Sequence, residues 1–169
     1  MTSTKLTGLV LLLFTLALTG CGVYSFTGAS IPVGAKTISI SYFVNSAPFV
    51  EPTLSQSLTD ALRDRFLSQT NLNFVSQDGD LQLEGVITDF STRPVAIQAD
   101  QIAAQNRLNV QVKVKFVNTL DPSKDFESTF SRYEDYSSNL DLNVVKDQLI
   151  SLINEALVED IFNRAVVNW

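Results

Sequence analysis

The sequence predicts an α+β fold: a mostly antiparallel sheet of four to five strands with two helices packed on one face. Residues 107–117 alternate apolar and polar side chains, which is typical of a strand with one buried face. Residues 54–66 and the segment from about residue 144 to the C-terminus carry apolar residues at helical spacing instead. The resulting order along the chain, β-α-β-β-β-β-α, favours an antiparallel sheet with both helices on one side.

The chain begins with the pattern of a secretory signal peptide at residues 1–20. Lys5 supplies a short positive region, and the apolar run 9–18 follows it. Ten residues that rise about 1.5 Å each cover roughly half of a hydrocarbon core, which is too little for a membrane span. The run ends at Leu18-Thr19-Gly20-Cys21, where small residues precede the only cysteine of the chain. Small side chains are required near a signal-peptide cleavage site.

The four residues 18–21 resemble the lipobox of bacterial lipoproteins. The resemblance implies cleavage before Cys21, a diacylglycerol thioether on Cys21 and an acyl chain, such as palmitate, on the freed amine. Several acyl chains make a stable anchor without a basic patch, because each buried methylene contributes about 0.8 kcal/mol. An ordinary secretory signal with a chance cysteine is the alternative. Residues 21–35, with scattered Gly and Pro, are expected to form a lipidated tether, and residues 36–169 a single domain.

Composition excludes several classes of protein. The chain has 12 Lys and Arg against 18 Asp and Glu, a net charge of −6, which argues against nucleic-acid binding. It has no His, so nucleophiles activated by His and the usual zinc sites are excluded. Its glycines are scattered, and no phosphate loop appears. The densest acidic group, Asp78-Gly79-Asp80, is interpreted as a hairpin turn. We expect no catalytic residue, no metal and no cofactor beyond the lipid on Cys21, hence no enzyme.

The first half of the domain is expected to contain a strand, a helix and two further strands. In residues 36–44, Ile38, Ile40, Tyr42 and Val44 share one face. A helix begins near Pro52, with Thr53 and Gln56 spaced as a capping box, and ends by Thr70. A short strand at residues 73–76 and the Asp-Gly turn lead into a strand at residues 81–90. Pro94 either ends that strand or makes it an edge.

The second half is expected to be a loop at residues 99–106, strands at 107–117 and 126–136 joined by a turn at 120–124, and a long helix from about Val144. Two apolar stripes run along this helix, rotated by more than a quarter turn from each other. The second stripe includes Val158, Phe162 and Trp169. Either the tether or a loop covers it, or it docks a partner protein.

Segments along nearly the whole mature chain resemble the LPS-assembly lipoprotein family, LptE. The resembling segments are residues 21–32 (CGVYSFTGASIP), 36–40 (KTISI), Asn45, Pro48, 53–55 (TLS), 79–81 (GDL), 94–98 (PVAIQ), 160–163 (DIFN) and 168–169 (NW). The resemblance implies a two-helix sandwich attached to the periplasmic side of the outer membrane. It also implies a partnership with the β-barrel LPS translocon, LptD, which a family member plugs and helps to assemble, and binding of LPS.

A rival interpretation is a periplasmic lipoprotein that activates a cell-wall synthase. Such proteins have a similar strand–helix start but a long disordered tether. Here only about fifteen residues precede the first strand, which keeps the domain near the membrane and favours the translocon role. An enzyme that acts through two carboxylates is the weakest alternative.

Three cations lie on the polar face of the strand 107–117: Arg107, Lys113 and Lys115. Arg can grip a phosphate with two hydrogen bonds, and Lys acts as a point charge beside it. We therefore identify these residues as candidates for contact with LPS phosphates. The alternative is a solvated strand face whose cations pair with Glu127 or Asp135 on a neighbouring strand.

Overall fold

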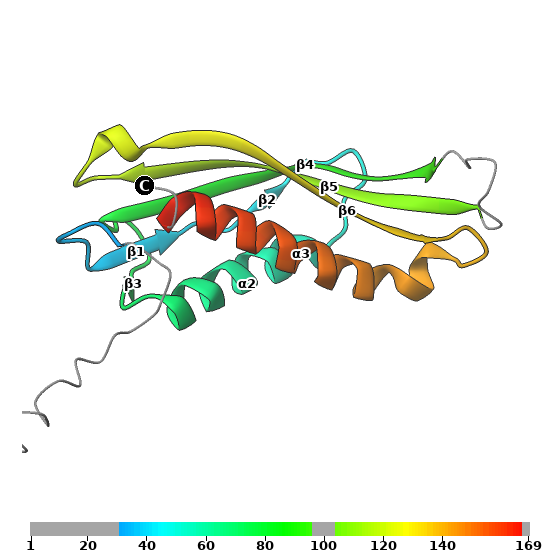
Figure 1. Cartoon of the computed structure of the whole chain (residues 1–169), viewed down its shortest axis with the longest axis horizontal. Coiled ribbons are helices and arrows are strands. Elements are labelled where there is room, and N and C mark those ends of the chain that lie inside the picture. Colours follow the sequence, from blue (N-terminus) through cyan, green and yellow to red (C-terminus); the bar gives the residue numbers. More distant parts are fainter. Residues whose placement is uncertain (1–30, 96–103, 167–169) are drawn as a thin grey trace, which may run out of the picture.

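A computed structural model describes residues 31–95 and 104–166 of the chain. In this part, one elongated sheet carries a layer of two helices on a single face (Figure 1). The predicted α+β class and the placement of both helices on one side are confirmed. Cys21, most of the expected tether and Trp169 lie outside the described residues.

The elements follow the chain in the order β-β-α-β-β-β-β-α, with a short 3-10 helix before the last strand. Their bounds are β1 (Thr37–Ile40), β2 (Val44–Asn45), α2 (Leu54–Gln69), β3 (Asn73–Phe74), β4 (Leu81–Val95), β5 (Gln105–Asn118), η1 (Pro122–Lys124), β6 (Phe126–Ser137) and α3 (Leu142–Val166).

The described sheet has six strands and is mixed. The three long strands β4, β5 and β6 are antiparallel neighbours, whereas the short strands β1, β2 and β3 pair in parallel. The order is β3-β1-β4-β5-β6, with β2 beside β4. The expectation of a mostly antiparallel sheet therefore holds for the three long strands. It does not hold for β1, β2 and β3, because β1 lies between β3 and β4 and is parallel to both.

The Asp78-Gly79 turn is not a hairpin, so that prediction is wrong. Residues 75–80 carry the chain across β1, from β3 on one side to β4 on the other. At the crossing, a Cβ on Gly79 would lie 2.5 Å from the backbone nitrogen of Ser39. Asp78 takes a positive φ of 54°. The Asp-Gly pair is needed here for a close crossing of two backbones, not for a turn between paired strands.

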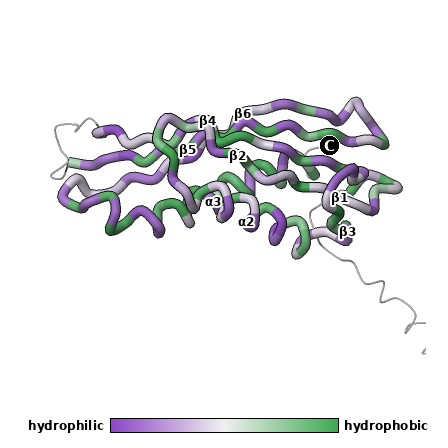
Figure 2. Tube along the Cα trace, turned by 180° about the vertical axis from the view of Figure 1, so that it is seen from behind, coloured by the Kyte–Doolittle hydropathy of each residue, from purple (hydrophilic) through white to green (hydrophobic). Residues whose placement is uncertain are grey.

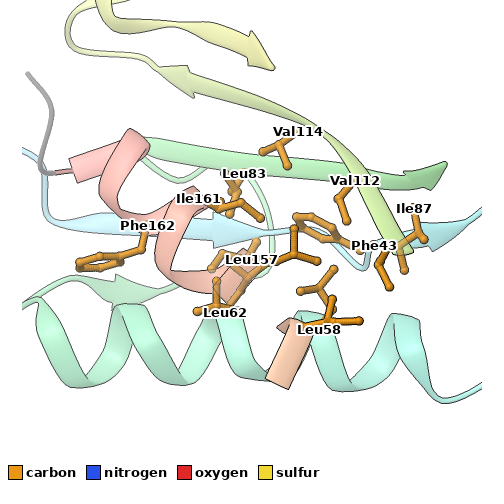
Figure 3. Close-up of a cluster of buried hydrophobic side chains, with 14 of the residues drawn as sticks. Phe43, Leu58, Leu62, Leu83, Ile87, Val112, Val114, Leu157, Ile161 and Phe162 are labelled. Atoms are coloured by element: carbon orange, nitrogen blue, oxygen red, sulfur yellow. The ribbon is translucent and has the colours of Figure 1, made fainter. Parts of the chain in front are cut away.

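The first predicted strand breaks after Ile40. Ile38 and Ile40 are buried as expected, but Tyr42 and Val44 are half exposed and Phe43 is fully buried instead. The alternation shifts by one residue because the chain leaves the ladder between β1 and β2, where the backbone N–H of Phe43 donates to Thr59 Oγ1 at 3.1 Å. The ring of Phe43 then enters the core between the sheet and α2 (Figure 3).

The predicted capping box of α2 does not form. Thr53 has helical backbone angles and makes no capping hydrogen bond with its side chain. Its hydroxyl donates to Glu51 Oε1 at 2.9 Å, and Gln56 Nε2 donates to Asp60 Oδ2 at 2.6 Å. Both side chains are therefore engaged elsewhere.

β4 continues through Pro94, which pairs with Asn106 of β5. The parallel neighbours of β4 stop at Ile87, so Pro94 lies where β4 is an edge strand on that side and no ladder donor is missing. The interpretation of Pro94 as an edge residue is confirmed. The loop expected at residues 99–106 is shorter at its end, since β5 begins at Gln105, and residues 96–103 are outside the described part.

The core lies between the sheet and the helices (Figure 3). Both helices run in the same direction: Lys146 contacts Glu51, Asn154 contacts Ser57, and Phe162 contacts Phe66, each pair further along both segments. Apolar side chains of β4 and β5 meet those of α2 and α3 in one cluster. On the tube coloured by hydropathy, polar and apolar residues alternate along the long strands (Figure 2). The helices therefore cover one face and leave the other open.

Candidate functional site

The uncovered face of the sheet, here called the open face, is built from alternate residues of the three long strands. On β5 the buried residues include Leu108, Val110 and Val112, so the side chains between them point away from the helices. These are polar for most of the strand, and their partners on β4 and β6 are mostly polar too. The open face includes Glu84, Asp89, Arg93, Arg107, Asn109, Gln111, Lys113, Lys115, Glu127, Thr129, Ser131, Tyr133 and Asp135.

Arg107 is held by two residues of β6. Its Nε and Nη2 donate to the carboxylate of Asp135 at 2.7 and 2.9 Å. Its guanidinium carbon lies 3.6 Å from the ring centroid of Tyr133, a cation–π geometry. The hydrogen bond from Arg107 lowers the pKa of Asp135, and the same bond raises the pKa of Arg107. Arg107 is thus a paired cation.

Lys113 is paired in the same way with Glu127 of β6. The hydrogen bond and the charge of Lys113 lower the pKa of Glu127, and the nearby charge of Lys115 adds to this effect. Lys115 lies beside Glu127 on β6 and beside Glu84 on β4 in the strand register. The structure therefore brings Arg107, Lys113 and Lys115 onto one face, as predicted. It also forms the pairs with Asp135 and Glu127 that the alternative interpretation expected.

A shallow hollow of about 440 Å³ lies on the open face beside Arg107. Arg93 of β4 faces Arg107 across the strand pair and lines this hollow with Asn109, Gln111 and Tyr133. Asp89 completes it and accepts hydrogen bonds from Ser91 and Asn109. Arg93 was not among the predicted site residues, because Pro94 left the end of its strand open. The alternation Asp89, Ser91, Arg93 would have placed it here.

The prediction that Val158 and Phe162 dock a partner is wrong. Val158 and Phe162 are buried in the chain's own core, and the ring of Phe162 packs edge-on against Phe66 of α2 at 5.0 Å. Phe162 of the second stripe faces α2 because the two helices lie side by side in one layer (Figure 1). Neither the tether nor a loop was needed to cover these two residues. Trp169 lies outside the described residues.

Neither α2 nor α3 is long and apolar enough to cross a membrane. In residues 31–95 and 104–166, no three acidic, Cys or His side chains gather in a group that could hold a metal ion.

Comparison with known proteins gives one family. The model of the family described as "LptE: Lipopolysaccharide-assembly" matches residues 35–165. None of the curated proteins matches the chain. Among solved structures, a minor lipoprotein from Acinetobacter baumannii has a TM-score of 0.51 at 11% identity, covering 77% of this chain and 91% of that one. A homolog of a neuraminyllactose-binding hemagglutinin from Helicobacter pylori also scores 0.51, at 9% identity, with 83% and 88% covered. At such low identity, these structures show a similar fold alone.

Proposed function

This chain belongs to the LptE lipopolysaccharide-assembly family, whose model covers residues 35–165, and we propose that it plugs and helps to assemble the β-barrel LPS translocon, LptD. In this role it supports insertion of LPS at the cell surface. The role requires a rigid domain and no catalytic group.

The observation that carries this proposal is the open face of the sheet. Its side chains are mostly polar, and two of its cations are paired with carboxylates, in Arg107–Asp135 and Lys113–Glu127. The interior of a wide outer-membrane barrel is polar as well. A face whose charges are already paired loses less on leaving water than a face with single charges. The open face therefore suits contact with the lumen wall of a barrel.

The length of the sheet supports the same role. β4 contains 15 residues and β5 contains 14. At about 3.3 Å per residue, these strands extend over about 45–50 Å. A bilayer with its headgroups is about 40–45 Å thick. The domain is thus long enough to reach through most of the height of a membrane barrel.

We place the domain at the periplasmic side of the outer membrane, anchored by acyl chains on Cys21. The chain takes ten residue steps from Cys21 to Ile31, where the described part begins. Fully extended, they reach at most about 33–36 Å. Such a tether holds the domain at the membrane and disfavours the rival role, activation of a cell-wall synthase deep in the periplasm.

Direct LPS binding is the second part of the proposal, at Arg107, Lys113 and Lys115. Since Arg107 and Lys113 already hold carboxylates, an LPS phosphate must compete with Asp135 or Glu127 for these cations. We expect the contact to be weak and sensitive to salt.

Photo-crosslinking in cells tests the plug. A photoreactive residue replaces Thr129 or Ser131 on the open face, and Gln56 or Glu159 on the helix layer as matched controls. After irradiation, the tagged chain is purified from detergent-solubilised outer membranes. We expect crosslinks to a large β-barrel protein, strongest from the open-face positions. Crosslinks to a cell-wall synthase, or no barrel at any position, would contradict the role.

A further inference from the structure

A groove of about 710 Å³ runs between α2 and α3 on the side of the helix layer away from the sheet. Ile150, Asn154 and Val158 of α3 are buried along its floor, next to Ala61 of α2. Polar side chains, most of them exposed, form its two walls: Thr53, Ser57, Asp64, Arg65 and Ser68 from α2, and Asp147, Ser151 and Glu155 from α3. The groove lies on the opposite side of the molecule from the open face.

Carboxylates dominate the charge of the groove. Asp64, Asp147 and Glu155 line it together with a single cation, Arg65. Asp147 and Glu155 are eight residues apart on α3, about 12 Å along the helix, with Ser151 midway. Elsewhere in the described residues, Glu51, Glu127, Asp135 and Asp160 are held by Lys146, Lys113, Arg107 and Arg132. In the described residues, none of the three groove carboxylates forms an ion pair within 4.0 Å with a Lys or Arg side chain.

The groove also contains a buried hydrogen-bond acceptor that lacks a donor among the described residues, the side-chain oxygen of Asn154. Asn154 is 5% exposed and donates its Nδ2 to Ser57 Oγ at 2.9 Å. Its Oδ1 is buried in the described structure without a hydrogen-bond partner. A buried acceptor left without a donor is destabilising, and such a group in a native structure is often completed by a ligand or a water molecule. Several ammonium or guanidinium groups on one segment would supply a donor to Oδ1 and positive charge to the carboxylates.

We propose that the groove between α2 and α3 binds a cationic segment of a partner protein, one that brings Lys or Arg side chains to Asp64, Asp147 and Glu155 and a donor to Asn154. The partner is a protein segment because the groove extends along two helices and has an apolar floor. The acidic walls repel the phosphates of LPS. This surface is distinct from the face proposed to meet the barrel, so both can be occupied at once.

Oligolysine is the probe for this proposal, with oligoglutamate of equal length as its counterpart. The full chain in a nonionic detergent is titrated against each fluorescent peptide at low salt, and anisotropy reports binding. We expect oligolysine to bind and oligoglutamate not to bind. The triple variant Asp64→Asn, Asp147→Asn, Glu155→Gln should weaken oligolysine binding by about tenfold, since each exposed ion pair contributes a factor of about two to five.

The matched control changes the net charge equally, at acids outside the groove: Asp78→Asn, Glu134→Gln and Glu159→Gln. We expect this triple variant to bind oligolysine within about twofold of the parent. An equal loss in both triple variants would show general attraction to an acidic protein and would overturn the proposal. So would binding of neither peptide, or of oligoglutamate.

Asn154 provides an independent arm of the experiment. Asn154→Ala removes the free acceptor, whereas Ser57→Ala breaks the same bond between the helices and leaves Oδ1 in place. We expect the first to weaken oligolysine binding more than the second at matched thermal stability. Equal effects would leave only the carboxylates and overturn the role of Asn154. If the triple variant does not fold, Glu155→Gln alone against Glu159→Gln makes the same comparison on one helix.

Discussion

The ring of Phe43 occupies the space that a side chain at Gly85 would fill. A Cβ on Gly85 would collide with the ring of Phe43, whose side chain is fully buried. Gly85 stands at a core-facing position of β4, between Leu83 and Ile87. The missing side chain in the middle of the strand is therefore replaced by an aromatic ring from the loop between β1 and β2.

Gly85→Ala is expected to lower the free energy of unfolding by about 1–3 kcal/mol, because the added methyl forces the Phe43 ring out of its place. Phe43→Ala should cost about 3–5 kcal/mol through the cavity it leaves. In the double variant, Phe43→Ala with Gly85→Ala, the methyl added on β4 has room, so the costs should sum to less than the two single values. Urea unfolding of the four proteins measures this coupling. Strict additivity would contradict the contact.

Val112→Asp is expected to destabilise the domain by more than about 3 kcal/mol, since it places an unpaired charge in the core. Val112 is fully buried on the helix side of β5, and Lys113 lies on the open face. Lys113→Asp should cost less than about 1 kcal/mol, because it breaks an exposed pair with Glu127. Thermal unfolding of the two variants ranks them, and the reverse order would contradict the facing of β5.

Patterns within one element of the sequence predicted the long strands and both helices well. The alternation around Val112 identified the core face of β5, since a strand between two antiparallel neighbours keeps its period of two along its whole length. The spacing of Leu58 and Leu62 identified the buried face of α2, because residues four apart lie on the same face of a helix. The cations of β5 and their partners Glu127 and Asp135 also followed from strand alternation.

The features that the sequence did not reveal depend on contacts between distant segments. Asp78-Gly79 reads as a hairpin because nothing local shows that β1 will lie between β3 and β4. Tyr42 continues the local alternation, but the void at Gly85 selects Phe43 for burial instead. Phe162 belongs to a stripe that looked exposed because its partner Phe66 is on the other helix.

Lowering the pH tests the hydrogen bonds of Asp80, which hold the chain where it crosses β1. Asp80 Oδ2 accepts hydrogen bonds from the backbone N–H groups of Lys36 and Thr37 and from the Thr37 hydroxyl, at 2.8–2.9 Å. These bonds, the one from Lys36 first, lower the pKa of Asp80 below its usual value. The stabilisation is present above the ordinary Asp pKa of about 3.9 and is lost as pH falls through the lower folded value.

We therefore expect Asp80→Asn to lower the melting temperature at neutral pH and to reduce the dependence of that temperature on pH below about pH 4. Asp78→Asn serves as control, because it alters a neighbouring acid of the same connection and keeps a residue type that tolerates positive φ. Calorimetry from neutral to acid pH gives both curves. Parallel curves for Asp80→Asn and the parent would contradict the proposed bonds.

Cys21→Ala is expected to abolish lipid modification and cleavage by the lipoprotein route. The physical reason is that the thioether needs the Cys21 thiol, and the chain has no other cysteine. Mass spectrometry of the N-terminus of the protein from membranes measures the added acyl mass, with Cys21→Ala as the comparison. An unmodified Cys21 in the parent, or cleavage elsewhere, would contradict the lipoprotein assignment.

Glu127→Gln is expected to strengthen LPS binding, although Glu127 itself cannot bind a phosphate. In the parent, Glu127 holds Lys113 and lies near Lys115, so it competes with a phosphate for both cations. Removing its charge releases them, whereas Lys113→Gln with Lys115→Gln should weaken binding by severalfold. Glu134→Gln is the matched control: it changes the net charge equally on the same strand, but Glu134 alternates onto the helix side. Binding of the full chain to LPS is measured at low and high salt. If Glu127→Gln and Glu134→Gln raise LPS binding equally, net charge alone explains the effect, and β5 does not contact LPS.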